Sequence, residues 1–290
     1  MKYALIFLGL LLFVSGCGER TSVSNTYSTP DWTKDGQVAC LQGITNERAD
    51  ALGGTIAKST TDWLTYMDAN GANAYADTDI TSDLASNLSM SSVATLAACA
   101  SGVGGGTFNK IVIRYLPSAT GTHVSKIELN VPNAVSFDWD STGGKIVYCN
   151  TAGEIRTINI DGTGDTLILD VDATSVAWKN GNRIAFTYLD SGVSKVALIN
   201  SDGTNRLNTN VASVSNLCVS RANTFEVFGV KSSTYVKINT QPVPVVETAV
   251  IASFSGSNPR LASTGDKIVF DSGNSLYTQD FTGAAAAKIK

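Results

Sequence analysis

The chain has 290 residues, a formal net charge of −4 at pH 7, one histidine and five cysteines. This length fits one large all-β domain or two ordinary ones, and the turn-rich composition with only 16% charged residues favours a single domain. The sequence has no basic run or basic-aromatic patch that could neutralise phosphates, so we expect no nucleic-acid partner.

The N-terminus carries an export signal. An apolar run of 12 residues, Tyr3–Val14, follows Met1 and Lys2. Because a membrane-spanning helix needs about 20 apolar residues, this run predicts a signal-peptide core. Residues 14–17 (VSGC) resemble a bacterial lipobox, which implies cleavage before Cys17, acylation of Cys17 and retention on a membrane by several acyl chains. The alternative is an ordinary secretory signal with an incidental cysteine.

The position after Cys17 predicts the destination. Gly18 is not the aspartate that usually keeps such lipoproteins on the inner membrane, so we expect the outer membrane, with the protein facing the periplasm. We predict a cleaved signal peptide over residues 1–16, an acylated tether over residues 17–28 and one folded domain over residues 29–290.

A repeated pattern of strands and turns is clearest between Ala134 and Asp170. Four short apolar strands are separated by the turn compositions STGG, NTAG and DGTG. Such short turns allow only antiparallel pairing. The pattern returns over residues 173–209, and Trp178 follows Trp139 after 39 positions (178 − 139). A fixed period of this size predicts a solenoid or a propeller.

The strands are apolar on both faces. In the second strand of the clear repeat, Ile146 and Tyr148 alternate with Val147 and Cys149, so both faces of the sheet must be covered. Small sheets of this kind can cover one another by stacking. A linear stack would leave two apolar faces in water, and closure into a ring removes that cost.

We therefore predict an all-β fold, a six-bladed β-propeller of four-stranded antiparallel blades. Within the first repeat, residues 43–59 are expected as a polar excursion with a short helical turn over residues 46–52. Closure of the ring is left open, and Ser22–Tyr27 is one segment that could contribute to it. The second-strand anchors of the repeats are Val38, Leu96, Ile146, Ile184, Phe225 and Ile268.

Three segments carry a family resemblance. Residues 30–36 (PDWTKDG), 138–144 (DWDSTGG) and 178–181 (WKNG) resemble the repeats of TolB-type, WD40-like β-propellers, as do the second strands KIVY (145–148), RIAF (183–186) and KIVF (267–270). The resemblance covers nearly all of the chain after residue 28 and implies the fold. It implies little about function, because that family includes periplasmic partners of envelope complexes, propeller domains fused to peptidases and a few sugar-cleaving lyases.

The tryptophans are expected to have a packing role. Trp32, Trp139 and Trp178 recur at matching positions, where each would end an inner strand and pack between blades. Trp63, on a third strand, is expected to pack as well. Stacking of these rings on a ligand is the alternative.

Four cysteines lie in the folded domain. An even count in an exported protein suggests two disulfides. However, matching positions of neighbouring sheets lie about 10 Å apart, whereas a disulfide joins α-carbons within about 7 Å. We therefore predict buried free thiols at Cys40, Cys99, Cys149 and Cys218.

The sequence offers no recognisable catalytic or metal-binding set. A Ser-His-Asp triad would have to use His123, and no Gly-x-Ser-x-Gly motif is present. A zinc site built on two imidazoles is excluded by the single histidine. Two acidic pairs could offer oxygen ligands to calcium, but carboxylates in turns more often bind their own backbone. The pairs are Asp138 with Asp140 and Asp170 with Asp172. We expect no catalytic residue, no metal and no cofactor.

Two functions follow from this pattern. The first is a membrane-tethered lipoprotein propeller that acts, as a monomer and without enzymatic activity, as a binding or scaffold module for a protein or for peptidoglycan or another polysaccharide of the cell envelope. The second is a carbohydrate-active propeller enzyme, a lyase or a hydrolase, that uses carboxylates in its central funnel. A funnel lined by several carboxylates would favour the second.

Overall fold

The computed structural model describes residues 20–32, 36–49, 55–72, 74–77, 86–91, 96–101, 107–115, 127–178, 182–220, 225–241 and 244–290. Within these ranges no helix has the length and apolar character that crossing a membrane requires. The first strands are β1 (Arg20–Trp32), β2 (Val38–Ala49), β3 (Thr55–Met67), β4 (Tyr75–Asp77), β5 (Ser86–Met90), β6 (Leu96–Ser101), β7 (Phe108–Tyr115), β8 (Ile127–Trp139), β9 (Lys145–Asn150), β10 (Glu154–Asn159) and β11 (Thr166–Asp170). The remaining strands are β12 (Ala173–Trp178), β13 (Arg183–Asp190), β14 (Val193–Asn200), β15 (Leu207–Ala212), β16 (Ser215–Val219), β17 (Glu226–Lys231), β18 (Thr234–Asn239), β19 (Val246–Ile251), β20 (Ser257–Leu261), β21 (Lys267–Ser272), β22 (Ser275–Asp280) and β23 (Ala287–Lys288).

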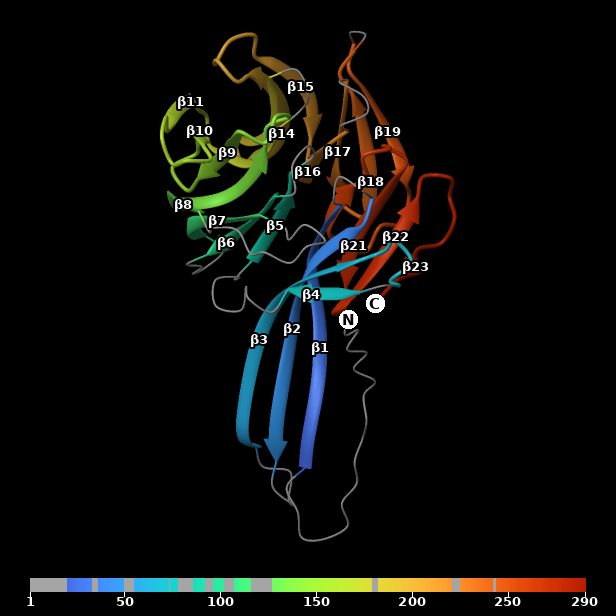
Figure 1. Ribbon diagram of the computed structural model, residues 1–290. Coiled ribbons are helices and arrows are strands. Elements are labelled where there is room, and N and C mark those ends of the chain that lie inside the picture. The colour runs from blue at the N-terminus through green and yellow to red at the C-terminus, as the bar shows by residue number, and fades with distance from the viewer. Residues whose placement is uncertain are drawn as a thin grey trace.

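The strands form an all-β propeller with five blades among the described residues (Figure 1). Four blades are antiparallel sheets of four strands, β1–β4, β12–β15, β16–β19 and β20–β23, and one sheet has seven strands, β5–β11. The predicted number of six blades is wrong. Strand β8 is continuous, and it pairs with β7 through Ile127–Asn130 and with β9 through Ser136–Trp139, so two expected repeats share one sheet.

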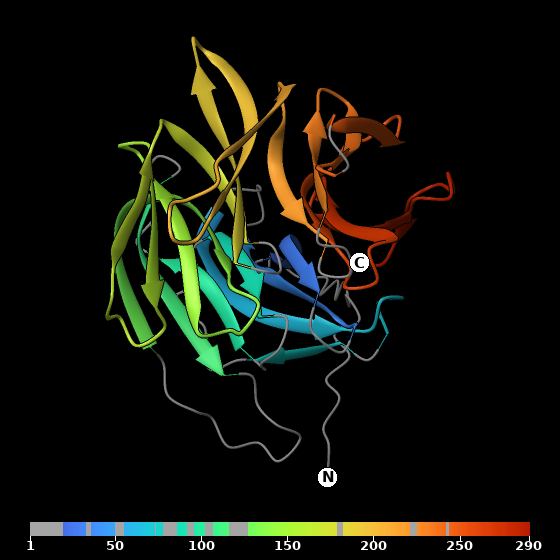
Figure 2. The same ribbon diagram turned by 90° about the horizontal axis from the view of Figure 1, so that it is seen from above.

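The ring is closed by contact between the first sheet and the last. Around the ring the contacting inner strands are β1, β5, β8, β12, β16, β20 and again β1 (Figure 2). The backbone N–H of Tyr27 donates to the carbonyl oxygen of Asn274, 3.2 Å away, in the turn between β21 and β22. Trp32 and Val38 of the first sheet share a buried cluster with Val269 and Leu276 of the last. The segment Ser22–Tyr27 therefore contributes to closure through Tyr27.

Two equivalent turns show why the later blades repeat closely. In Asp161-Gly162-Thr163 and Asp202-Gly203-Thr204, the aspartate Oδ1 accepts from the threonine backbone N–H at 2.9 Å in both cases. The central glycines have φ of +84° and +83°, a region that side chains with a Cβ rarely adopt. The Asp-Gly-Thr composition thus fixes the same tight turn twice.

The predicted second-strand anchors mostly form the core. Val38, Ile146, Ile184 and Ile268 are fully buried. Phe225 is a wrong assignment, because it precedes β17, its side chain is 43% exposed and Val227 takes the buried place. The side chain of Leu96 lies outside the described part.

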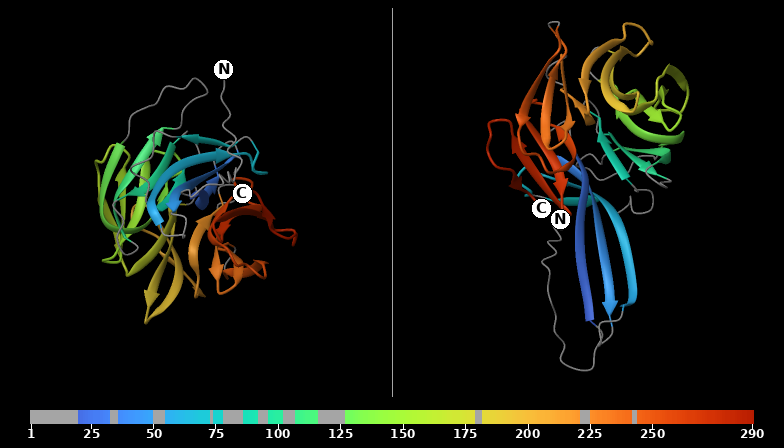
Figure 3. Two further views of the ribbon diagram at one scale, coloured as in Figure 1. Left: turned by 90° about the horizontal axis from the view of Figure 1, so that it is seen from below. Right: turned by 180° about the vertical axis from the view of Figure 1, so that it is seen from behind.

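The first sheet carries a long extension that we call the arm, formed by residues 20–26 of β1, 44–49 of β2 and 55–61 of β3. The arm leaves the ring as a three-stranded ribbon (Figures 1 and 3). Its register is continuous from Arg20 opposite Ala49 to Thr26 opposite Gly43. Residues 20–28, expected in the tether, are therefore strand, and residues 46–49, expected in a helical turn, are strand as well. Residues 21–25 of β1 (TSVSN) are exposed one after another, so both faces of this strand meet solvent.

Candidate ligand-binding cavity

The inner strands have irregular register near their beginnings. The pairing shifts between Ala134 and Ser136 in β8 and between Ala173 and Ser175 in β12. It shifts again between Ser215 and Cys218 in β16 and at the start of β20. An extra residue in a strand bends it and turns a side chain out of the alternating pattern. The bulges thereby place polar side chains at the axis of the ring.

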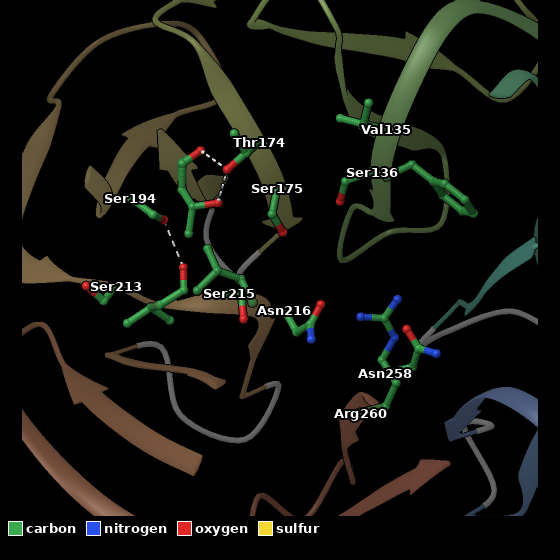
Figure 4. A pocket seen from close by; sticks show the side chains of 14 residues that line it. Val135, Ser136, Thr174, Ser175, Ser194, Ser213, Ser215, Asn216, Asn258 and Arg260 are labelled. Carbon is green, nitrogen blue, oxygen red and sulfur yellow. Dashed lines mark hydrogen bonds between the residues drawn. The ribbon is translucent and has the colours of Figure 1, made fainter. Parts of the chain in front are cut away.

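These bulges surround a cavity of about 500 Å³ at the ends where the inner strands begin (Figure 4). Its volume lies within the range of about 300–1,000 Å³ that is usual for small-molecule sites. Most lining side chains carry a hydroxyl or a carboxamide. The lining residues are Val135, Ser136, Phe137, Thr174, Ser175, Thr187, Ser194, Ser213, Val214, Ser215, Asn216, Leu217, Asn258 and Arg260.

Arg260 is the one charged residue of this lining, and no carboxylate is among the lining residues. Its side chain extends into the space between Asn216 and Ser136 (Figure 4). Its positive charge also acts on the interior beneath the cavity. Burial raises the pKa of the Cys218 thiol to about 11, and Arg260 is among the groups that oppose this rise. The cavity is thus a hydroxyl-rich site with a single cation.

At the end of β8, an Asp-Trp pair joins neighbouring inner strands. The carboxylate of Asp138, in β8, accepts from the Ser89 hydroxyl at 3.1 Å and from the Trp178 backbone N–H at 2.9 Å. The indole N–H of Trp139 donates to the carbonyl oxygen of Ser89 at 3.0 Å. The pair therefore connects β8 to both β5 and β12.

The same pair occurs in β1. Asp31 accepts from the backbone N–H of Met90, in β5, at 2.7 Å, and the indole of Trp32 donates to the carbonyl oxygen of Arg260, in β20, at 3.1 Å. We call these two pairs, Asp31-Trp32 and Asp138-Trp139, the Asp-Trp clamps. Trp178 is preceded by Ala177, and its buried indole N–H has no hydrogen-bond partner among the described residues.

The predictions for tryptophan and cysteine are confirmed where the structure describes them. Trp32, Trp139 and Trp178 end inner strands and are at most 5% exposed, between blades. Buried free thiols are found at Cys40, Cys149 and Cys218. The side chains of Trp63 and Cys99, and all of Cys17 and His123, lie outside the described residues.

The carboxylates of the Asp138–Asp140 pair bind mainly to the backbone. Asp140 accepts from the backbone N–H groups of Gly144 and Lys145, at 2.9 and 3.0 Å, and Asp138 belongs to a clamp. In the part of the chain that the structure describes, no three His, Cys, Asp or Glu side chains gather closely enough to hold a metal ion.

A polar network on the outer part of the seven-stranded sheet is already satisfied. The Tyr148 hydroxyl donates to the carboxylate of Asp165 at 3.0 Å, and the Arg156 Nε donates to the same carboxylate at 3.0 Å. Burial, followed by the bond to Asp165, raises the pKa of Tyr148. Because these groups bind one another, the network ties β9 and β10 to the turn before β11.

Sequence reasoning left the ligand-binding residues unassigned. Composition and spacing do not single out Asn216 or Asn258 as binding residues. The residue type was the one signal in the sequence, because asparagine is enriched at positive φ. Both asparagines have such a φ, +50° and +49°, at the bulges. Composition does not predict which side chains a bulge turns toward the axis of the ring.

The fold is shared with solved propeller structures. A chain of a nidogen/laminin complex is 13% identical, with a TM-score of 0.59 and coverage of 91% of this chain and 93% of that chain. TolB from Acinetobacter baumannii is 11% identical, with a TM-score of 0.59 and coverage of 91% and 78%. A chain of a mitotic checkpoint complex is 11% identical, with a TM-score of 0.53 and coverage of 96% and 99%.

These likenesses show the fold alone, since all three identities are low. No family model and no curated protein matches the chain. The chain is a β-propeller similar in fold to TolB and to other propeller proteins.

Proposed function

We propose that this chain is a non-enzymatic binding module of the bacterial cell envelope, held at a membrane through Cys17 and binding its partner at the central cavity. The lining of the cavity carries the proposal. It offers hydroxyls, carboxamides and one guanidinium, which are groups that hold a ligand in place. A site that hydrolyses glycosides would typically need a pair of carboxylates across the bond to be cut, and the lining residues include none.

The partner belongs to the envelope in this proposal, and is a protein or a cell-wall polysaccharide. The support is the lipobox-like segment before Cys17, which favours the outer membrane and the periplasmic side. The propeller acts as a monomer in this proposal, and its ring is completed within one chain by contacts between the first and last sheets.

The proposal is tested by crosslinking in the native envelope. A photoreactive residue replaces Ser213, at the cavity, or Thr248, on β19, as a matched control. Crosslinked species are identified by mass spectrometry, with and without Ser175→Tyr, which fills the cavity. We expect a crosslinked partner from position 213, none of the same identity from position 248, and loss of the adduct with Ser175→Tyr.

Two further results decide the remaining parts of the proposal. Cys17→Ala should move the protein from the membrane fraction to the soluble fraction, and a mature protein without acyl groups would refute the anchor. Turnover of an envelope polysaccharide or peptide by the purified protein, abolished by Ser175→Tyr, would refute the non-enzymatic role.

A further inference from the structure

The polar side chains around the cavity divide into two sets. Members of the first set are already bonded within the fold. The Ser194 hydroxyl donates to the carbonyl oxygen of Val214 at 2.9 Å, and the hydroxyls of Thr174 and Thr187 bind each other at 2.8 Å. These bonds hold the wall of the cavity, so these groups are engaged before any ligand arrives.

The second set has no such engagement. Within the described residues, no hydrogen bond or ion pair involves the side chains of Ser175, Ser213, Asn216 or Arg260. They come from β12, from the segment just before β16, from β16 and from β20, so they surround one space (Figure 4). A fold that leaves four neighbouring polar side chains unbonded at one cavity has hydrogen-bonding capacity to offer a ligand.

The second set carries one positive charge, on Arg260. A guanidinium presents a planar fork of donors that matches a carboxylate, and such charge-assisted pairs are stronger than neutral hydrogen bonds. Arg260 has no carboxylate partner within the described residues and is only partly exposed. A ligand carboxylate would therefore supply the missing counter-charge.

The neutral members indicate the rest of the ligand. Serine hydroxyls and the Asn216 carboxamide can both donate and accept, as the hydroxyls of a sugar can. The apolar side chains of Phe137, Val214 and Leu217 are buried, so most of the side chains that face the cavity carry a hydroxyl, a carboxamide or the guanidinium. A compact, hydroxylated ligand suits this wall better than an extended peptide.

We propose that the cavity binds a small acidic sugar, with its carboxylate on Arg260 and its hydroxyls on Ser175, Ser213 and Asn216. This inference rests on the proposed function, because it names the ligand class of the same cavity. The cavity of about 500 Å³ is large enough for a ligand of this size.

The test compares sugars that differ by one carboxylate. Titration calorimetry of the propeller measures the affinity for D-glucuronate against D-glucose, and for N-acetylmuramate against N-acetylglucosamine. We expect an acidic sugar to bind about 10- to 100-fold more tightly than its neutral parent, as a charge-assisted hydrogen bond provides. Arg260→Gln should remove this preference, and Arg260→Lys, which keeps the charge without the fork, should retain part of it.

A matched control uses a second arginine. Arg156→Gln removes a guanidinium that is paired with Asp165 on another part of the ring, and it should leave the affinities unchanged. Ser213→Ala and Asn216→Ala should weaken binding of acidic and neutral sugars alike by a few fold. Circular dichroism of each variant confirms that the fold is retained.

The inference is overturned by any of three results. These are equal binding of acidic and neutral sugars, a preference that survives Arg260→Gln, and no binding of any acidic sugar up to about 10 mM. Binding of inorganic phosphate at Arg260 without binding of acidic sugars also overturns it. If a cavity-dependent crosslinked partner is still captured in the envelope, the proposed function stands and only the acidic-sugar ligand is refuted.

Discussion

The two sides of the ring are held together differently. From β20 through β1, β5 and β8 to β12, the Asp-Trp clamps connect neighbouring inner strands by hydrogen bonds. Strand β16 is joined to its neighbours by apolar packing, with Leu217 and Val219 against Ala177 on one side and Cys218 against Leu261 on the other. The cavity lies beside β16, and its wall also includes residues of the clamped strands β8, β12 and β20.

The difference shows how a repeated fold makes room for a site. Where aspartate and tryptophan end an inner strand, their polar groups satisfy the backbone of the adjacent strands. Strand β8 carries both features, because it ends in a clamp and has a bulge near its beginning that lines the cavity. Four predictions sharpen or break this comparison, from the largest expected effect to the smallest, and a fifth concerns alkaline pH.

Asp138→Ala should have the largest effect on stability. The substitution removes the acceptor of the Trp178 backbone N–H and of the Ser89 hydroxyl and leaves these part-buried donors without a partner. We expect a loss of about 3 kcal/mol in the free energy of unfolding, measured by urea titration. Asp202→Ala, at an exposed turn, is the control. Equal losses in the two variants would show that the clamp contributes nothing specific.

Replacing two tryptophans by phenylalanine isolates the indole hydrogen bond. Trp139→Phe loses the bond to Ser89, whereas Trp178→Phe removes an N–H that has no partner in the described residues. Because both variants lose the same volume, we expect Trp139→Phe to cost about 1–2 kcal/mol more than Trp178→Phe in urea unfolding. A larger loss for Trp178→Phe would contradict the comparison.

Two serines of the cavity should differ in the same way. Ser194→Ala removes a bond to the Val214 carbonyl and should cost about 1 kcal/mol of unfolding free energy. Ser213→Ala removes a side chain with no partner in the described part of the chain and should change stability by less than about 0.5 kcal/mol. Thermal unfolding of both variants measures this. Equal losses would place Ser213 among the groups that build the wall.

The order in which the buried thiols are alkylated at pH 8 tests the comparison without any substitution. Burial raises the pKa of Cys40 to about 12 and that of Cys218 to about 11, so both are protonated and slow to react in the native state. Since Cys218 lies at the unclamped side, we expect it to be alkylated before Cys40 through local opening, as followed by peptide mass spectrometry. Labelling of Cys40 first would reverse the order of stability that the clamps imply.

The raised pKa of Cys40 also predicts how alkaline pH changes the free energy of unfolding. An unfolded thiol loses its proton near pH 9, whereas the native thiol of Cys40 keeps it to about pH 12. The native state therefore binds more protons in this window, and stability is complete below pH 9 and falls as the pH rises toward 12. Urea midpoints at pH 8, 9 and 10 measure this, and a rising midpoint would contradict the burial of the thiols.

The fold class could be predicted because its signals are local. Alternating apolar residues, the Asp-Gly turns and the recurring tryptophans each follow from a few neighbouring residues. The number of blades was wrong because it depends on β8. Pro132 and Asn133 look like a break by composition, yet the strand continues through them, with Asn133 at φ +53° and its carbonyl accepting from Thr151. A proline does not interrupt a strand where its missing N–H is not needed for pairing.

The candidate site was not predictable for a related reason. Arg260, Ser175 and Asn216 are far apart in the sequence and gain their common direction only from bulges in separate strands. The clamps could be predicted only in part. Asp31 and Asp138 precede tryptophans in a recognisable motif, but the N–H groups that donate to their carboxylates lie on other strands.

The arm has a consequence for orientation at a bilayer. Arg20, at its free end, lies three positions after Cys17, and β1 leaves the ring at the end where the other inner strands begin. Arg20–Thr26, at about 3.3 Å per residue, gives the arm a length of roughly 23 Å. With a lipid on Cys17, the ring would stand off the headgroups by about this distance with its cavity turned toward them. A ligand would then arrive sideways, through the gap between ring and membrane.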